Sequence, residues 1–444
     1  MYNFKKGFYA DIRIEDRYET NLRLQNGQLH EAKEAVEKKA FIRVFDGKMW
    51  YYTSTDDVNN IQSALEELYG YATPNTQIDN HPIVVKYQVN KDKIIKFDKT
   101  CVKKIPLQQK LQLITDTVSR MNSELCSFKS ATYLDRYSVY EFYSSKGADI
   151  KYDFQTCGVA YGLAFNYNEE NLQEQLSKCE TVFDKLQYSE DELQTFISRC
   201  ENYIKNAKPV TAGTYPVILA PIATGVFAHE SFGHKSEADF MLGDETMAKE
   251  WTLGKKVGSD ILTIRESGVF EGSGYVPYDD EGTKATDTYL IKDGILTGRL
   301  HSATTAAALN EELTGNARAI NCNYEPIVRM TSTFIEAGNS TVDELISGIK
   351  HGYYIHSIKH GSGMSTFTIA PRIAYEIVDG KLGDPVKIAV LTGSVFETLG
   401  LIDGVANDRT LLSFVTGGCG KMEQYPLNVG LGGPHIRVSR MNIQ

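Results

Sequence analysis

The amino-acid sequence predicts an α+β protein that is built mainly from antiparallel sheets. Pairs of strand-like segments meet across tight turns, segments with helical periodicity are few, and hairpins outnumber β-α-β alternations. We expect an N-terminal domain over residues 1–207 that mixes hairpins with helices. Residues 208–444 are expected to form a C-terminal domain dominated by an antiparallel, barrel-like sheet that carries a helix with the sequence H-E-x-x-x-H.

Turn signals predict two hairpins near the N-terminus. Residues 22–25 meet residues 28–29 across Asn26-Gly27, a dipeptide typical of two-residue type I′ turns. Residues 40–52 repeat this chemistry around a central Asp-Gly-Lys turn. Residues 130–166 are rich in tyrosine and β-branched side chains, so we expect strands there as well.

Apolar side chains spaced three or four residues apart predict helices in the same region. One helix spans residues 58–69 and ends before Gly70, a residue type that commonly follows a helix. A second begins at Pro106, and a third opens with Ser189 and Glu192 in the spacing of a capping box. The apolar stripes are assigned to the core and given no function: Leu107, Leu111, Ile114, Val118 and Met121 in the second helix, and Leu193, Phe196, Ile197, Cys200 and Ile204 in the third.

The expected domain boundary lies in residues 206–213, where helix-breaking and small residues indicate a linker. A strand over residues 215–220 follows, and Thr224 is expected to cap a helix that begins at Gly225. Further local signals in this half of the chain predict hairpin turns at Asp293-Gly294 and Asp379-Gly380. They also predict a helix start at the capping box of Thr341 and Glu344.

Composition excludes several classes of protein. A net charge of −10 argues against nucleic acid as a direct ligand, because phosphate binding needs a basic surface. No apolar run approaches the ~20 residues of a membrane-spanning helix, and the first residues contain no signal-peptide core. The seven cysteines are scattered without a C-x-x-C pair, which is typical of reduced thiols. We therefore expect a cytoplasmic protein without membrane contact.

The stretch from His229 to His234, His-Glu-Ser-Phe-Gly-His, carries the most specific chemistry in the chain. Two imidazoles suit zinc, and a carboxylate such as Glu230 can take a proton from metal-bound water. The spacing is one residue longer than in H-E-x-x-H, so a regular helix would point the two imidazoles about 140° apart. The helix must therefore end, kink or form a π-type turn between them, and Gly233 is the residue that most easily allows it.

Catalytic zinc usually has three protein ligands, so a third ligand must come from elsewhere in the chain. Cys419 is flanked by glycines, and a thiolate binds zinc strongly. On local evidence, a small residue buried in a tight turn explains Cys419 equally well. Glu237, Asp239 and Asp244 are competing ligands or ordinary surface carboxylates. The remaining candidates are expected to be surface or hydrogen-bonded histidines: His301, His351, His356, His360 and His435.

Three other segments are weaker signals. Residues 279–283, Asp-Asp-Glu-Gly-Thr, could bind a hard cation or line a site, although such an acidic run is usually a solvated turn. The glycine-rich stretches 361–363 and 430–433 match neither the P-loop nor the Rossmann fingerprint, so they give little support for nucleotide binding.

Taken together, these motifs resemble those of the TldD/PmbA family, whose members are also called modulators of DNA gyrase. Three motifs occur in the family's order: H-E-x-x-x-H at 229–234, D-D-E-G-T at 279–283, and C-G-K at 419–421 with the glycine-rich stretch that follows. The segment T-G-N-x-R at 314–318 matches less specifically. The N-terminal domain resembles that of the family in its arrangement of hairpins and helices. The chain starts almost at its first expected strand, so the pairing role of the family's N-terminal helical extension is not carried over.

The resemblance implies a zinc metallopeptidase that hydrolyses peptides or unfolded polypeptide segments. It implies that His229, His234 and Cys419 bind Zn²⁺ and that Glu230 is the general base that activates zinc-bound water. It also implies a homodimer, or a heterodimer with a family paralogue, whose active site faces an internal chamber and binds substrate as an added strand. The intact H-E-x-x-x-H motif places the chain on the family's catalytic branch.

Three alternatives to this interpretation stay open. The chain could be a non-catalytic partner or scaffold subunit of a TldD/TldE-like complex. Cys419 and His435 could form a cysteine hydrolase, which would survive chelators and be inactivated by iodoacetamide. A link to DNA gyrase would be indirect, through proteolysis of a toxin or antitoxin, because the acidic charge disfavours contact with DNA.

Overall fold

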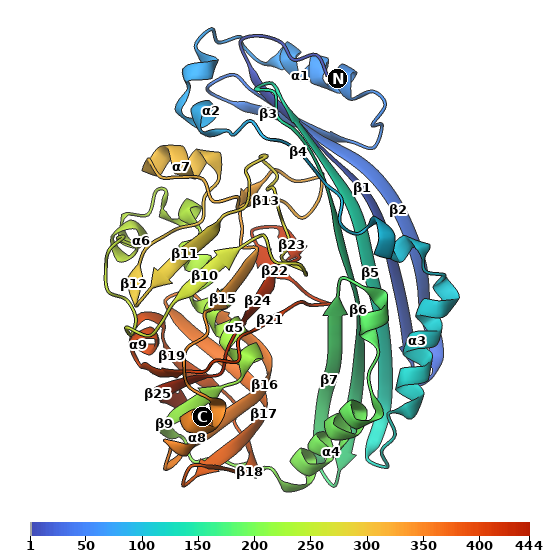
Figure 1. Cartoon of the computed structure of the whole chain (residues 1–444), viewed down its shortest axis with the longest axis vertical. Helices are drawn as coiled ribbons and strands as arrows, with labels where there is room; N and C mark the ends of the chain where they lie inside the picture. The colour runs from blue at the N-terminus through green and yellow to red at the C-terminus, as the bar shows by residue number, and fades with distance from the viewer. Residues whose placement is uncertain (1) are drawn as a thin grey trace.

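A long curved sheet forms one side of the molecule in the computed structural model, which describes residues 2–444. Its strand order is β3-β2-β1-β5-β6-β4, and β7 pairs with β6. The sheet runs nearly the full height of the view in Figure 1. Its strands are β1 (Tyr9–Gln25), β2 (Gln28–Phe45), β3 (Trp50–Thr55), β4 (Lys91–Ile94), β5 (Cys126–Ser144), β6 (Asp149–Tyr167) and β7 (Glu170–Glu180).

The predicted hairpins are confirmed by the turn conformations. Asn26 and Gly27, with φ of 46° and 78°, join β1 to β2, as a type I′ turn requires. Residues 46–49 join β2 to β3. The expected strands over 130–166 are also present, but they extend beyond both predicted ends as β5 and β6. The edge strand β7 was not predicted.

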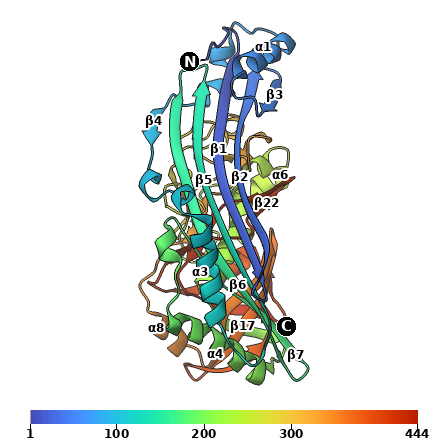
Figure 2. The same ribbon diagram turned by 90° about the vertical axis from the view of Figure 1, so that its right-hand side faces the viewer.

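Helices cover the outer face and both ends of this sheet. Figure 2 shows α3 (Leu107–Arg120) lying across the outer face. The helix α4 (Glu190–Asn206) begins with the predicted capping box of Ser189 and Glu192. The helix α1 (Ile61–Tyr71) starts later than predicted and includes Gly70. The expectation that Gly70 follows the helix is therefore wrong; its surroundings are open, so nothing forces the helix to end there.

A closed barrel of five strands, most of them paired antiparallel, forms the centre of the C-terminal half. This barrel confirms the predicted barrel-like sheet. The strand order is β16-β9-β25-β19-β17, and pairing of β16 with β17 closes the ring. The strands are β9 (Gly213–Leu219), β16 (His351–Gly363), β17 (Thr366–Val378), β19 (Leu391–Ser394) and β25 (Ile436–Ile443). β18 (Lys381–Lys387), β8 (Lys208–Pro209) and β20 (Ile402–Val405) extend this sheet.

A second sheet stacks above the barrel in Figure 1, with the order β12-β11-β10-β15-β24-β21. Its strands are β10 (Ile264–Ser267), β11 (Asp287–Lys292), β12 (Ile295–Leu296), β15 (Ser332–Ile335), β21 (Thr410–Leu412) and β24 (Gly430–Gly433). Two short hairpins pair β13 (Ala317–Arg318) with β14 (Ile327–Val328) and β22 (Cys419–Lys421) with β23 (Gln424–Leu427). The remaining helices are α2 (Pro82–Lys86), α5 (Pro221–Ala228), α6 (Glu245–Glu250), α7 (Ala303–Leu309), α8 (Val342–Ser347) and α9 (Val395–Gly400).

Local turn and cap signals in the C-terminal half are also confirmed. Asp293-Gly294 joins β11 to β12, and Asp379-Gly380 joins β17 to β18, each with both residues at positive φ. Thr341 and Glu344 form the predicted capping box of α8. The expected linker over 206–213 contains β8, which pairs in parallel with β18. We propose to keep the domain division at residue 207, because α4 ends at Asn206 and β8 already belongs to the C-terminal sheet.

The acidic segment 279–283 is buried between the two halves, so it is not a solvated turn. Arginine side chains, rather than a metal cation, pair with its carboxylates. Arg43 of β2 contacts Glu281 at 3.1 Å and Asp11 at 2.9 Å. Arg13 of β1 contacts Asp280 at 2.9 Å. These ion pairs tie the long sheet to the C-terminal half. Within residues 2–444, no helix combines the length and the apolar character that crossing a bilayer requires.

Candidate metal centre

The H-E-x-x-x-H segment leaves regular helical geometry where the spacing of its histidines predicts it. α5 ends at Ala228, residues His229–Gly233 form a π-helical turn, and residues His234–Ser236 tighten into a 3₁₀ turn. A π turn contains more residues than an α-helical turn, so each residue rotates less about the axis, and positions i and i+5 come to lie on one side of it. The two imidazole rings consequently lie 5.1 Å apart between centroids.

The start of this helix differs from the prediction. Pro221 is its first residue and Ala220 precedes it, so the helix is longer than expected. Thr224 does not cap it. Its hydroxyl instead donates to the carbonyl oxygen of Leu219 from inside the first turns. The early start is explained by proline, whose fixed φ suits the first helical position.

Gly233 has a different role from the one predicted. Its φ and ψ are −56° and −51°, an ordinary helical conformation that any residue can adopt. A Cβ atom at this position would instead collide with the sulfur of Met330. Gly225 is similar, because its Cβ would lie 2.7 Å from the backbone nitrogen of Gly432 in β24. Gly225 and Gly433 therefore allow α5 and β24 to pack closely, whereas Gly430 and Gly432 are confined by Ser332 of β15 and Thr410 of β21.

The structure brings His229, His234 and Cys419 together. Their possible ligand atoms all lie within 4.8 Å of one another. The sulfur of Cys419 is 3.4 Å from Nε2 of His234. His229 and Cys419 are 3% exposed, so the cluster is shielded from bulk water. No other group of three such residues was found within residues 2–444.

The donor set fits a zinc ion. Burial alone would raise the pKa of the Cys419 thiol, but hydrogen bonds from His229 and His234 outweigh it and lower the pKa to about 5. A thiolate with two imidazoles is a ligand set that zinc prefers. In addition, Nδ1 of His229 is buried and has no hydrogen-bonding partner among the described residues. A buried polar atom without a partner is costly unless a ligand satisfies it.

Cys419 is presented by the short β22–β23 hairpin. Its side chain, like those of Lys421, Gln424 and Leu427, is buried, while Met422 and Tyr425 on the other face are exposed. Below the hairpin, Nη2 of the fully buried Arg329 donates to the carbonyl oxygen of Cys419 at 2.8 Å.

The competing carboxylates have other partners. Glu237 accepts a hydrogen bond from Nδ1 of His234 at 3.2 Å and lies 3.0 Å from the ammonium of Lys421. Asp239 also contacts Lys421, at 2.7 Å. Asp244 caps α6 by accepting from the backbone of Thr246. Glu237 therefore contacts a candidate ligand and is not itself one of the clustered groups.

The other histidines lie outside the cluster. His301 is buried beside Glu311, and His351 contacts Glu376 on the surface. Burial lowers the pKa of His356 to about 4. His360 is exposed. The two ring nitrogens of His435 contact Asp408 at 2.6 Å and Tyr354 at 3.0 Å, so among described residues it does not pair with Cys419.

Glu230 lies on the π turn next to His229 and is half-buried. Strand β16 passes beside it. A Cβ atom on Gly361 would lie 3.8 Å from Cγ of Glu230, and one on Gly363 would lie 3.2 Å from the Glu230 carbonyl oxygen. The end of β16 therefore forms a wall beside this carboxylate.

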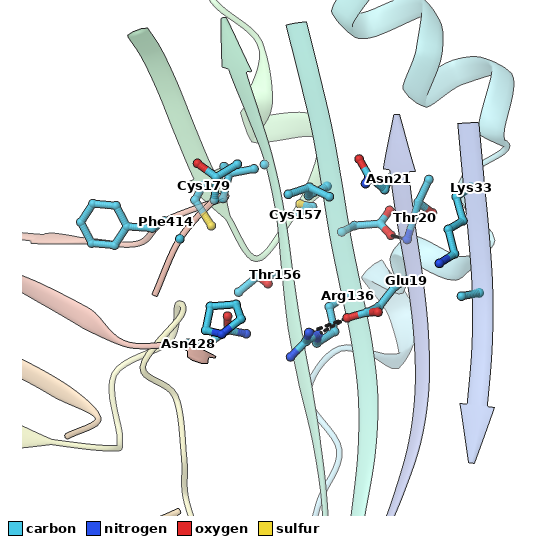
Figure 3. Close-up of a pocket in the computed structure, with 18 of the residues that line it drawn as sticks. Glu19, Thr20, Asn21, Lys33, Arg136, Thr156, Cys157, Cys179, Phe414 and Asn428 are labelled. Atoms are coloured by element: carbon cyan, nitrogen blue, oxygen red, sulfur yellow. Dashed lines mark hydrogen bonds and ion pairs between the residues drawn. The ribbon is translucent and has the colours of Figure 1, made fainter. Parts of the chain in front are cut away.

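A cavity of about 380 Å³ adjoins the β22–β23 hairpin, between the long sheet and the loop that precedes Cys419 (Figure 3). Glu19 and Arg136 form an ion pair on its sheet wall, with Nε 2.6 Å from Oε1. Val415 and Pro426 contribute the opposite wall. The clustered residues do not line this cavity, so it lies beside the cluster and does not contain it.

Sequence reasoning missed three buried residues around the cluster. Lys421 was noticed only as a part of the C-G-K motif. No pattern in the sequence distinguishes Arg329 from a surface arginine, because its burial depends on segments that are distant in the chain. Glu266 is buried and accepts hydrogen bonds from Thr331 and Thr333. Burial raises the pKa of Glu266, although the hydrogen bonds from Thr331 and Thr333 partly oppose that effect.

Comparison with known proteins agrees with this assembly of motifs. Residues 212–444 match the family model described as the PmbA/TldA metallopeptidase C-terminal domain, and residues 10–72 match domain 1 of the same family. A metalloprotease of Methanocaldococcus jannaschii is 31% identical, covering 97% of this chain and 96% of the relative. A zinc metalloprotease TldD homologue of Saccharolobus solfataricus is 29% identical, covering 98% and 96%.

Solved structures share the fold at lower sequence identity. A Thermotoga maritima protein, described as a modulator of a DNA gyrase, has a TM-score of 0.76 and 18% identity over 99% of this chain and 96% of its own. TldE from Thermococcus kodakarensis has a TM-score of 0.74 and 14% identity over 98% and 96%. With the matched family models and full-length relatives, the motifs and the fold lead to one conclusion: this chain is a member of the TldD/PmbA family of metallopeptidases.

Proposed function

We propose that this protein is a zinc-dependent peptidase whose metal is held by His229, His234 and Cys419. The observation that carries the proposal is the convergence of these two imidazoles and one thiol within 4.8 Å, in a buried position next to Glu230. The names of the full-length relatives support peptidase chemistry, and zinc is named in one of them. A zinc ion held there would polarise the scissile carbonyl and lower the pKa of a water molecule.

Glu230 is the proposed general base. Glu230 follows His229 directly in the chain, on the π turn that ends immediately before His234. From this position it would accept the proton of the attacking water and pass it to the departing amine nitrogen. Among the described residues no ion pair involves Glu230, whereas Glu237 is held by Lys421. Glu230 is therefore the better candidate for proton transfer.

The proposed substrates are peptides or unfolded segments bound in an extended conformation. The wall formed by the end of β16 beside Glu230 is suited to such binding, since residues 356–363 extend beyond the pairing of β16 with β9, and an unpaired strand edge can hydrogen-bond to an added strand. Main-chain hydrogen bonds would bind many sequences with little selectivity. We further propose a dimer, with a second copy or a TldE-like partner, in which an internal chamber admits only flexible chains.

Metal content and a Glu230→Gln variant test the proposal. The purified protein should contain about one zinc per chain. Glu230→Gln should keep that zinc and lose cleavage of an unstructured peptide by at least ~100-fold, the usual scale for a general base. The matched control is Glu245→Gln, which changes a carboxylate whose side chain is 93% exposed. Full peptidase activity in Glu230→Gln would reject the role of Glu230.

A Cys419→Ala variant tests the third ligand. It should lower the zinc content, whereas Cys126→Ala, in the long sheet, should leave it unchanged. Unchanged zinc in Cys419→Ala would assign the third position to a carboxylate such as Glu237. A wild-type protein that binds no metal would favour the alternative of a non-catalytic partner subunit.

A further inference from the structure

A buried lysine connects the two segments that supply the clustered residues. Lys421 lies on β22, two residues after Cys419, and its side chain is 3% exposed. Its ammonium lies 3.0 Å from Oε2 of Glu237 and 2.7 Å from both carboxylate oxygens of Asp239. It also donates to the carbonyl oxygen of Val328 at 2.9 Å. The ring of Phe240 lies below it, at 4.4 Å.

Glu237 continues this connection to the second histidine. The oxygen that contacts Lys421, Oε2, also accepts a hydrogen bond from Nδ1 of His234 at 3.2 Å. Because Nδ1 is engaged in this way, Nε2 is the nitrogen directed toward the sulfur of Cys419. Histidines that bind metals usually donate their other ring N–H to a carboxylate or carbonyl, which fixes the ring orientation.

We propose that Lys421 is a positioning residue for the metal centre, which acts through Glu237 and holds the Cys419 strand at a fixed distance from the His234 ring. The proposal rests on the proposed metal site, but it concerns residues that do not themselves bind metal. The β22–β23 hairpin and the turn that carries Glu237 are far apart in the sequence. Because the Lys421 ammonium contacts both, it keeps the Cys419 thiol and the His234 imidazole at a fixed separation. Burial strengthens this effect, since an ion pair shielded from water is screened much less by salt.

Metal affinity, rather than peptidase activity, is the direct readout. Lys421→Met keeps most of the length of the unbranched side chain and removes its charge. We expect it to weaken zinc binding by 10- to 100-fold in competition with a chromophoric chelator, as is usual when a partner of a metal-binding histidine is lost. The cobalt-substituted protein should also change, because loosened ligand geometry alters the thiolate-to-cobalt charge-transfer band and the ligand-field bands of cobalt.

The matched control is Lys110→Met in α3. Lys110 is also buried and lies 2.6 Å from the buried carboxylate of Asp135, but this pair joins α3 to β5 of the long sheet, in the N-terminal half. It should lower stability without changing zinc affinity or the cobalt spectrum. Asp239→Asn provides a second variant that retains Lys421. Asp239 is 23% exposed, so this change is tolerated more easily, and it should weaken zinc binding in the same direction.

A double-mutant cycle tests whether Lys421 acts through Glu237. Glu237→Gln alone should weaken zinc binding, and adding Lys421→Met should weaken it by much less than the product of the two separate effects. Independent effects that multiply would overturn the proposed route through Glu237. Wild-type zinc affinity in both Lys421→Met and Asp239→Asn, with zinc still bound by the native protein, would overturn the positioning role alone. Absence of zinc binding in the native protein would overturn this inference and the proposed function together.

Discussion

Nε2 of His234 lies 3.4 Å from the sulfur of Cys419, although 185 residues separate the two in the chain. The contact also sets their protonation. Burial favours a neutral imidazole, but the hydrogen bonds to Cys419 and Glu237 outweigh it and raise the pKa of His234 to about 10. Burial raises the pKa of Cys419, but hydrogen bonds from His229 and His234 outweigh it and lower the pKa to about 5. Without metal, the pair is therefore an imidazolium and a thiolate near neutral pH.

Zinc binding should consequently release about one proton at neutral pH. The thiolate is already deprotonated, whereas His234 must lose its proton before its nitrogen can bind a metal. The zinc association constant should rise about tenfold per pH unit between pH 6 and pH 8, because this interval lies between the two pKa values. Calorimetry in buffers of different ionisation enthalpy measures the released proton. A pH-independent affinity with no proton release would contradict the assignment.

Metal removal separates zinc chemistry from cysteine chemistry. Chelation should abolish cleavage of an unstructured peptide, and added zinc should restore it, because the proposed chemistry depends on a Lewis acid. The measurement is peptidase activity before chelation, after it and after zinc is restored. Activity that survives complete metal removal and disappears with iodoacetamide would instead support a Cys419 nucleophile. The contacts of His435 with Asp408 and Tyr354 make the alternative Cys419–His435 pair unsuitable for that role.

Gly225→Ala should destabilise the protein. Its new Cβ would lie 2.5 Å from Cδ1 of Leu431 and 2.7 Å from the backbone nitrogen of Gly432, so α5 would have to move away from β24. Overpacking of this kind costs ~1–3 kcal/mol. We expect a lower midpoint of thermal unfolding and a lower zinc affinity, since α5 leads into the π turn.

Gly70→Ala is the matched control for that substitution. Gly70 also lies in a helix, but nothing lies within 4 Å of where its Cβ would be. Alanine there should stabilise the folded state by ~0.5–1 kcal/mol, because glycine loses more backbone entropy in a helix. If both variants unfold at the wild-type temperature, the close contact between α5 and β24 is not present.

Arg43→Met should weaken the junction between the long sheet and the C-terminal half. It would leave the carboxylates of Asp11 and Glu281 buried without their main cation. Removing one partner of a buried ion pair typically costs ~3–5 kcal/mol. Thermal unfolding and limited proteolysis between the two halves measure the effect. Lys208→Ala is the control, because its pair with Asp384 is exposed and should contribute nothing measurable.

Local signals in the sequence were sufficient for many individual elements. Asn26-Gly27 and Asp379-Gly380 form the predicted turns, because both residues of each pair tolerate positive φ. The capping boxes at Ser189 and Thr341 start helices as predicted, because a side chain reaches a backbone N–H only three residues away. The spacing of His229 and His234 required a distorted helix, and a π turn is present. All these features depend on interactions within a few residues.

Other local predictions were wrong where packing decided the outcome. Thr224 could have capped a helix, but Pro221 starts it earlier. Gly233 was expected to supply backbone freedom, yet its backbone is ordinary helix and the Met330 side chain packs where a Cβ would lie. The acidic segment 279–283 looked like a solvated turn, but Arg13 and Arg43 of the long sheet bury it. In each case the deciding neighbour is distant in sequence or has no recognisable local signal.

The sequence by itself determined the α+β class, the principal turns and helix starts, and the distortion between the two histidines, because backbone preferences and short-range hydrogen bonds are encoded locally. Only the tertiary structure decided that Cys419 joins His229 and His234 in one cluster, whereas Glu237 and Asp239 contact Lys421. It also decided that Lys421 neutralises those two carboxylates. The physical reason is that burial and charge pairing depend on which distant segments pack together, and a linear sequence does not specify those distances.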